Sequence, residues 1–138
     1  MSAGCLFCAI TSGEVPAALV IETDEVVGFL DHRPLFKGHT LIVPRAHHVT
    51  LADLPPQLLT SVFTAAQRLA AVMPAELEAE GTFVAMNNIV SQSVAHAHVH
   101  VVPRTKGDGL RGFFWPRTKY AAGEAHEYAA RLRTAFDG

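Results

Sequence analysis

The segment over residues 96–102 alternates between histidine and small apolar residues, reading His-Ala-His-Val-His-Val-Val. Successive side chains of a β-strand point to opposite faces, so the pattern predicts a strand with three imidazoles on one face. At a rise of roughly 3.3 Å per residue, neighbouring imidazoles would lie about 6.6 Å apart. His98 could therefore share a substrate with His96 or His100, whereas His96 and His100 must have different tasks.

Imidazole side chains at these positions are suited to phosphoryl transfer. It is the side chain whose unperturbed pKa lies near neutrality. The neutral ring is a nucleophile and the charged ring donates two hydrogen bonds, and phosphoryl transfer uses both kinds of group. The alternative is a metal-binding histidine stripe, or a polar sheet face without chemistry. Three buried imidazoles without partners would be costly, which favours a functional interpretation.

The rest of the chain predicts an α+β fold. Strands are expected over 19–23, 26–31, 39–43 and 82–87, and a loop over 32–38. Apolar residues at helical spacing predict a long helix over 56–73, which Pro74 should stop or kink, and a C-terminal helix over 122–136. Because the strands mostly follow one another and the helices are segregated, we expect an antiparallel sheet rather than a doubly wound one.

Size and charge narrow the function. The 138 residues predict a single domain over 1–138, with 104–138 as a C-terminal extension made of a basic aromatic loop and a helix. The net charge of −2 argues against a protein that coats nucleic acid or anionic membrane. Two cysteines exclude a disulfide scaffold, and without a visible secretory signal we expect a cytoplasmic protein.

Several ordered motifs resemble one family. These motifs are the histidine segment 96–102, the Cys-Leu-Phe-Cys run at 5–8, Asp31, the Gly-His-Thr-Leu-Ile-Val-Pro run at 38–44, and Gln-Ser-Val at 92–94. Together they resemble the histidine triad (HIT) superfamily, in the branch of bacterial histidine triad nucleotide-binding proteins. The resemblance covers most of residues 5–103 and implies an antiparallel HIT-like fold and a homodimer.

The resemblance also implies an activity. It implies a hydrolase that cleaves at the α-phosphate of a purine nucleotide, with His98 as the nucleophile of a nucleotidyl-histidine intermediate that water then releases. His100 and Ser93 would assist, and no organic cofactor is expected. The substrate stays open between an adenosine phosphoramidate and a dinucleoside polyphosphate, and the expected partner is a purine nucleotide such as AMP or one of these compounds. The rival hypothesis is a nucleotide-binding sensor or interaction module with little turnover.

Other polar residues are candidates for substrate binding. The resemblance assigns the ribose hydroxyls to Asp31, although a turn-capping aspartate is the alternative. It places Asn87 and Ser93 near the α-phosphate, with Gln92 beside them, because neutral donors can hold phosphate oxygens. The loop over 88–91 lacks the glycines usual in the family, which makes the role of Asn87 less secure. His39 is expected to support the histidine segment, or to be a plain polar strand residue.

A zinc site is predicted from the two cysteines. Cys5 and Cys8 have the spacing of zinc thiolates, and a tetrahedral ion needs two more ligands. His47 and His96 are the candidates, as in some bacterial proteins that this chain resembles, and a closed Cys₂His₂ site would be structural. The alternatives are a redox pair or plain free thiols.

The segment over 104–119 carries a local charge of +4 and the aromatic run Phe-Phe-Trp at 113–115. It could hold anionic leaving groups, or it could be a solvated loop with an aromatic anchor. His32, His48 and His126 have no expected role.

Overall fold

The computed structural model describes residues 4–110 and 117–138. Its elements, in chain order, are α1 (Leu6–Thr11), β1 (Leu19–Glu22), β2 (Val26–Leu30), β3 (Thr40–Pro44), the 3₁₀ turn η1 (Leu51–Asp53), α2 (Pro56–Glu76), β4 (Gly81–Ala85), β5 (Val99–Arg104) and α3 (Glu124–Asp137). They divide into two units, Met1–Asp108 and Gly109–Gly138, which are described one at a time.

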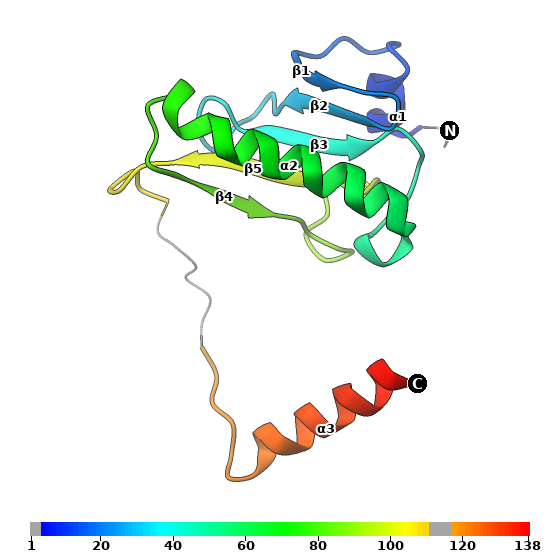
Figure 1. The fold of residues 1–138 in the computed structure, drawn as a ribbon, viewed down its shortest axis with the longest axis vertical. Coiled ribbons are helices and arrows are strands. Elements are labelled where there is room, and N and C mark those ends of the chain that lie inside the picture. The colour runs from blue at the N-terminus through cyan, green and yellow to red at the C-terminus, as the bar shows by residue number, and fades with distance from the viewer. Residues whose placement is uncertain (1–3, 111–116) are drawn as a thin grey trace. The chain divides into compact units, whose positions relative to one another are not determined.

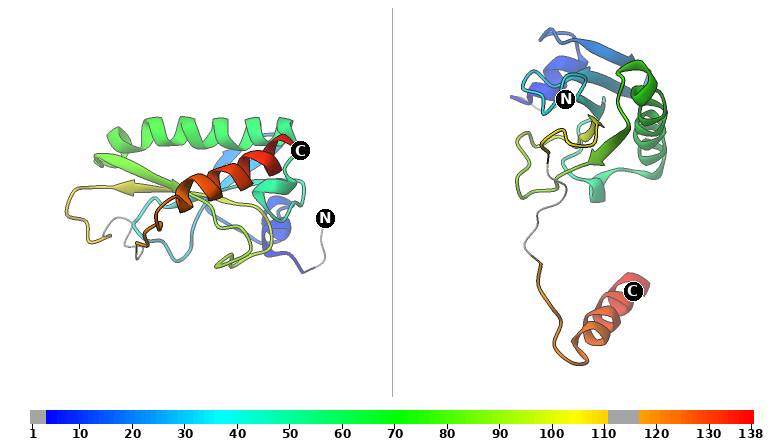
Figure 2. Two further views of the ribbon diagram at one scale, coloured as in Figure 1. Left: turned by 90° about the horizontal axis from the view of Figure 1, so that it is seen from below. Right: turned by 90° about the vertical axis from the view of Figure 1, so that its left-hand side faces the viewer.

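The first unit is a five-stranded antiparallel sheet in the order β1-β2-β3-β5-β4. Long helix α2 lies across one face of this sheet (Figures 1 and 2). The α+β prediction is therefore confirmed. Short connections produce the β1-β2-β3 meander, whereas α2 separates β3 from β4, so that β5 pairs with both.

The three inner strands, β2, β3 and β5, bury residues on both of their faces. On the α2 side, Val62 and Ala66 pack in one cluster with Ile42 and Val101. On the other side, Phe7 of α1 packs in a second cluster whose strand members are Val27, Phe29, Leu41 and Val43. The alternation along β2 and β3 explains both clusters, because successive side chains leave a strand on opposite faces. Cross-strand partners share a face, so the pairing of Leu41 with His100 puts His100 on the α1 side.

Most predicted boundaries agree with the structure to within about two residues, and two differ by more. The alternating segment predicted a strand from residue 96, but β5 begins at Val99. The reason is that the backbone N–H of Ala97 donates to the carbonyl of His48 at 2.7 Å, so this stretch follows residues 47–48 before it joins β3 and β4. Pro74 does not stop α2, which runs on to Glu76. A proline there removes one hydrogen bond from the last turn, and the N–H of Leu77 still reaches Met73 at 2.9 Å.

By length and composition, α2 could also span a membrane. Core helices of globular proteins meet the same description, and here the buried side of α2 packs on the sheet.

The second unit contains α3, which agrees with the predicted helix to within two residues at its start. None of the residues of α3 is buried within the unit. Residues 111–116, which include the whole predicted aromatic run at 113–115, lie outside the described residues.

Candidate functional site

His98 is buried immediately before β5, and one of its ring nitrogens is fixed by the backbone. Its Nδ1 atom lies 2.7 Å from the carbonyl oxygen of His96. A carbonyl oxygen only accepts, so Nδ1 carries the proton and donates it. In the neutral ring the lone pair is then on Nε2. The local fold therefore sets the tautomer that a nitrogen nucleophile requires.

A second chain of hydrogen bonds sets the tautomer of His100. The backbone N–H of Leu35 donates to Nδ1 of His39 at 3.1 Å. The remaining nitrogen of neutral His39, Nε2, carries its proton and lies 2.9 Å from Nδ1 of His100. His100 accepts that bond, so its own proton is on Nε2. The rings of His98 and His100 have centroids 5.1 Å apart. The site thus pairs a nitrogen lone pair with a nitrogen proton donor.

Gly38 provides the backbone conformation that places His39 in this series of hydrogen bonds, just before β3. Gly38 adopts a φ of +104°, a conformation that favours glycine. A Cβ at this position would lie 2.4 Å from Cδ1 of Leu77. The positive φ is therefore the main reason for glycine before His39, since the exposed Leu77 side chain could move away from a Cβ.

Asp31 lies at the end of β2 beside the same histidines. Its Oδ1 atom accepts the backbone N–H of Arg33 at 2.9 Å, which is the turn role considered above. Its Oδ2 atom lies 3.8 Å from Nε2 of His39, and the carboxylate side chain is 19% exposed. The turn bond orients the carboxylate toward the histidine cluster, so the two roles expected for Asp31 are compatible.

Burial keeps the imidazoles neutral. It lowers the pKa of His98 and that of His39, and the nearby Asp31 carboxylate partly opposes both shifts. For His100, burial and the neighbouring His98 and His39 lower the pKa to about 4. At neutral pH these rings are therefore uncharged, which leaves His98 able to attack and His100 able to donate a neutral N–H.

The polar residues before the histidine segment are held by backbone contacts. Gln92 donates to the carbonyl of Val49 at 2.6 Å and accepts the N–H of Ile89 at 2.8 Å. Asn87 donates to the carbonyl of Ser91 at 3.3 Å. Ser93 is exposed. No hydrogen bond among the described residues joins Asn87, Gln92 or Ser93 to an imidazole, so the structure assigns to Gln92 a loop-fixing contact that the sequence did not predict.

The loop over 88–91 is strained. Ile89 has a φ of 69° and Ser91 a φ of 62°, both in the left-handed region. This conformation is unfavourable for a β-branched residue such as Ile89. The missing glycines noted in the sequence thus lie where the backbone would favour them, and the contacts of Gln92 and Asn87 hold the loop in place.

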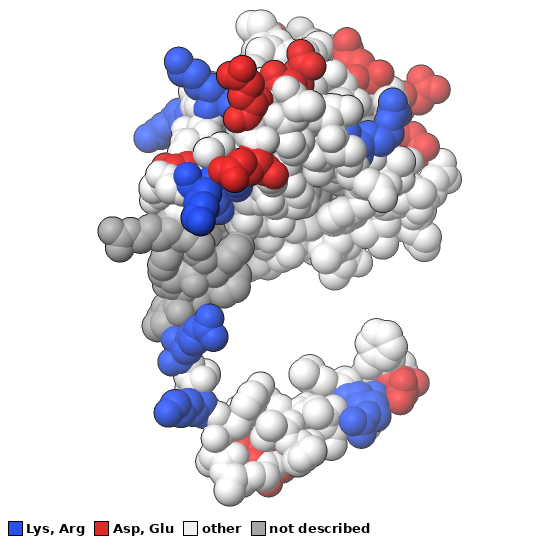
Figure 3. All heavy atoms as spheres, turned by 60° about the vertical axis from the view of Figure 1, so that its left-hand side comes forward, with Lys and Arg blue, Asp and Glu red and all other residues white. Residues whose placement is uncertain are grey.

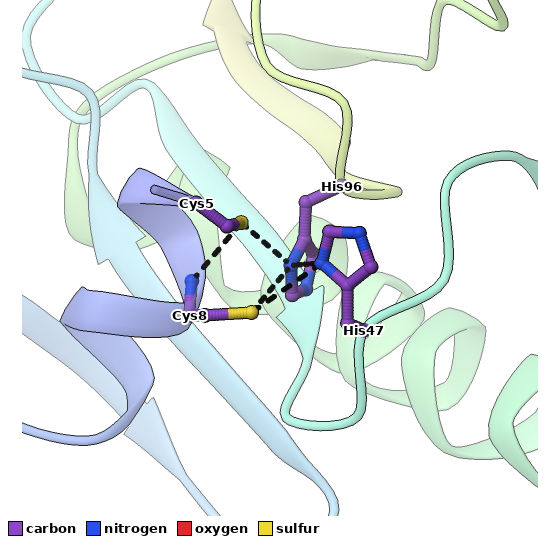
Figure 4. Close-up of side chains that lie close together, drawn as sticks. All are labelled: Cys5, Cys8, His47 and His96. Carbon is purple, nitrogen blue, oxygen red and sulfur yellow. Dashed lines mark hydrogen bonds between the residues drawn. The ribbon is translucent and has the colours of Figure 1, made fainter. Parts of the chain in front are cut away.

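A second cluster joins the four predicted metal ligands. Their ligand atoms all lie within 4.8 Å of one another, and Figure 4 shows Cys5, Cys8, His47 and His96 converging. Nδ1 of His96 lies 3.4 Å from Sγ of Cys5, 3.6 Å from Sγ of Cys8 and 3.2 Å from Nδ1 of His47. Sγ of Cys8 lies 3.4 Å from Nδ1 of His47. The ligands come from α1, the segment after β3 and the segment before β5.

These separations fit a tetrahedral zinc ion. With Zn–S near 2.3 Å and Zn–N near 2.05 Å, tetrahedral angles place a sulfur and a nitrogen about 3.5 Å apart and two nitrogens about 3.3 Å apart. The tautomer of His96 also fits, because its Nε2–H donates to the carbonyl of Pro44 at 2.8 Å and leaves the Nδ1 lone pair facing the sulfurs. Both thiols are free, and burial raises the pKa of Cys5, which disfavours a reactive redox thiol.

The basic segment is partly neutralised within the first unit. Arg104, at the end of β5, forms a two-bond ion pair with Asp108, at 2.6 and 3.1 Å. The face in Figure 3 carries charged side chains of both signs, with uncharged surface between them. At its first residue, the predicted cationic loop is therefore charge-paired within the first unit.

Phe7 is a member of the site that sequence reasoning missed. Its ring lies edge-on to His98, with centroids 5.0 Å apart. The signal was present in the sequence, since Phe7 lies between the two predicted thiolate ligands. Among the other histidines, His32 is exposed and lies 3.9 Å from Asp31, and the carbonyl of His48 binds the backbone of Ala97.

Three comparisons bear on this site. A family model described as HIT domain matches residues 12–107. Adenosine 5'-monophosphoramidase HNT1 of Saccharomyces cerevisiae is 36% identical over 118 residues, which are 84% of this chain and 72% of the relative.

Two solved structures are similar. One is SMU.412c from Streptococcus mutans, with a TM-score of 0.91, 28% identity, and coverage of 99% of this chain and 87% of that one. The other is a Zn-bound histidine triad family protein from Mycobacterium smegmatis, with a TM-score of 0.74, 37% identity, and coverage of 96% and 97%.

Proposed function

Because the chain belongs to the HIT domain family, we propose that it is a hydrolase that cleaves a purine nucleotide at the α-phosphate. The observation that carries this proposal is the bond from Nδ1 of His98 to the carbonyl of His96, which leaves Nε2 with a lone pair. The likeness to a relative named adenosine 5'-monophosphoramidase supports an adenosine phosphoramidate as substrate. A dinucleoside polyphosphate is the alternative.

The reaction takes two displacements. Nε2 of His98 forms a bond to the α-phosphorus while the bond from phosphorus to the leaving nitrogen or oxygen breaks. The leaving group takes a proton from solvent water as it departs, and the attacking water of the second step returns one proton to the solvent. Water then attacks the nucleotidyl-histidine, the P–N bond to His98 breaks, and the nucleoside monophosphate is released with water's oxygen on phosphorus.

The neighbours of His98 have supporting roles in this proposal. The Nε2–H of His100 donates to a phosphate oxygen or to the leaving group, since its Nδ1 is occupied by His39. The Asp31 carboxylate accepts from the ribose hydroxyls. Ser93 and Asn87, both exposed, supply neutral donors to the α-phosphate, and Gln92 holds the loop that carries them.

Trapping of the intermediate tests this proposal. The wild type, His98→Ala and His98→Asn are mixed with radiolabelled adenosine phosphoramidate, quenched in alkali to preserve P–N bonds, and separated from free nucleotide. We expect label on the wild type only, with AMP release at a matching rate. Wild-type protein that carries no label and releases no monophosphate would refute the enzyme proposal. If it still binds AMP by calorimetry, the sensor hypothesis replaces it.

A substrate panel separates the two leaving-group chemistries. Adenosine and guanosine phosphoramidates are compared with diadenosine tri- and tetraphosphates, with monophosphate release as the common readout. Preference for the phosphoramidates would support P–N cleavage as the principal reaction, whereas preference for the polyphosphates would assign P–O–P cleavage.

We also propose that Cys5, Cys8, His47 and His96 bind one structural zinc ion. The support is the tetrahedral spacing of the ligand atoms and the likeness to a Zn-bound family member. When bound, the ion would supply no open position for chemistry and would join α1 to the segment before β5. Elemental analysis should give one zinc per chain, lost in a Cys5→Ser/Cys8→Ser variant. A variant that retains one ion would refute this ligand set.

A homodimer completes the proposal. Strand β4 is an edge of the sheet, and Val84 on it is exposed, as is Phe63 on α2. An apolar sheet edge of this kind is suited to pairing with a second copy. Light scattering should give twice the chain mass, and Val84→Lys should shift it toward the monomer. A monomeric wild type at micromolar concentration would contradict the proposal.

A further inference from the structure

Phe7 links the metal-ligand cluster to the proposed nucleophile. It lies in α1 directly between Cys5 and Cys8, and it is 4% exposed. Its ring meets three others edge-on: His98 at a centroid distance of 5.0 Å, His96 at 5.9 Å and Phe29 at 5.4 Å. Phe29 therefore supports one side of the Phe7 ring, and the two imidazoles contact other parts of it.

The His98 ring needs such a contact. Its hydrogen bond to the carbonyl of His96 fixes one atom, about which the ring could still turn. The ring has aromatic neighbours in Phe7 and His100, with centroids at 5.0 and 5.1 Å. A phenyl ring has no hydrogen-bonding atom, so it restricts the imidazole and excludes water without competing for the Nε2 lone pair.

Helix α1 cannot fix Phe7 by itself. It has six residues, too few to be stable alone, and Cys5 is its N-cap, with Sγ accepting the N–H of Cys8 at 3.3 Å. The two thiols that flank Phe7 also face His47 and His96. Anything that holds those four ligand groups together holds Phe7 in place.

We propose that Phe7 is a positioning residue for His98, and that the cluster of Cys5, Cys8, His47 and His96 fixes Phe7 through α1. The proposal rests on the proposed function for the identity of the nucleophile. The geometric claim itself concerns the free protein, so it can be tested without turnover.

The first test measures the His98 ring directly. Ring-nitrogen NMR of histidine-labelled, metal-loaded protein near neutral pH should show His98 as the Nδ1–H tautomer in the wild type. In Phe7→Ala we expect mixed tautomers or a broadened His98 signal. Phe7→Leu, which keeps apolar bulk, should lie between the two. Val27→Ala, a truncation in the same apolar cluster, is the matched control and should leave the His98 signal unchanged.

The second test separates positioning from binding. With adenosine phosphoramidate, Phe7→Ala should lower kcat by about 10- to 100-fold with KM within about twofold of wild type, as expected when a reacting atom is misplaced by a fraction of an ångström. Phe7→Leu should recover most of kcat. A rise in KM at unchanged kcat would overturn the proposal by showing that Phe7 contacts substrate.

The third test removes the metal ion. Chelation of the wild type should change the His98 signal as Phe7→Ala does, and chelation of Phe7→Ala should add little further change to that signal.

An unchanged His98 signal in Phe7→Ala, or an equal change in Val27→Ala, overturns the proposal. If Phe7→Ala does not fold, Phe7→Leu decides by the same criteria. A wild type that forms no nucleotidyl-histidine while its His98 signal depends on Phe7 would refute the proposed function and leave the positioning claim standing.

Discussion

Nε2 of His39 lies 2.9 Å from Nδ1 of His100, although the two residues are 61 positions apart in the chain. Strands β3 and β5 bring them together, and the Leu35 N–H on the other side of His39 sets the direction of the bond. The pair therefore determines which nitrogen of His100 carries the proton that faces the reaction.

This relationship predicts the effect of changing His39. His39→Ala should lower kcat/KM by about tenfold or more, because His100 loses the donor that sets its tautomer. His39→Gln offers an amide N–H at a similar reach and should recover part of the loss. Steady-state kinetics with thermal unfolding as a folding control would measure this. Wild-type kcat/KM in His39→Ala would show that the hydrogen bond has no influence on the reaction.

Acid should destabilise the protein through its buried imidazoles. The pKa of His100 is lowered to about 4 by burial and by His98 and His39, whereas in the unfolded chain it is near 6.5. Below the unfolded pKa the unfolded chain binds more protons, so stability present above about pH 6.5 is lost as pH falls toward 4. For His100 alone the loss is on the order of 3 kcal/mol. Urea unfolding across this range should show it, and a flatter profile is expected for His100→Asn. Equal pH dependence in both proteins would contradict this origin.

Removal of the metal should loosen the N-terminal part of the chain. Because a ligand that binds only the folded state stabilises it, chelation of loaded protein should lower Tm by at least about 5 °C. Added zinc should restore Tm in the wild type and have no effect in Cys5→Ser/Cys8→Ser. Calorimetric scans would detect this, and an unchanged Tm after complete metal loss would count against a structural ion.

The strained loop gives a stabilising substitution. Ile89→Gly removes a left-handed β-branched residue, and we expect the free energy of unfolding to rise by about 1 kcal/mol. Val90→Gly is the matched control, because Val90 is the exposed neighbour of Ile89 and its backbone φ is not positive. This substitution should lower the free energy of unfolding by about 0.5–1 kcal/mol. Urea denaturation of both variants would test this. A destabilised Ile89→Gly would mean that side-chain contacts outweigh the strain.

Much of the fold followed from local pattern. The helical spacing over 56–73 and the short apolar runs around residue 27 and residue 42 specified α2, β2 and β3, because periodicity reports which side of an element is buried. The pairing of strands was harder to predict from the sequence. The start of β5 depends on a hydrogen bond between Ala97 and His48, which no local sequence pattern encodes.

The candidate site divides in the same way. The residue types and spacing of the histidine segment and of Cys5 and Cys8 were enough to select nucleophile and metal-ligand candidates, since these chemistries need particular side chains. The tautomer of His98 follows from the local backbone geometry, which places its Nδ1 atom on the carbonyl of His96. Only the tertiary structure decided the tautomer of His100, the turn of His96 toward the thiols and the place of Phe7, because each depends on atoms contributed by distant segments.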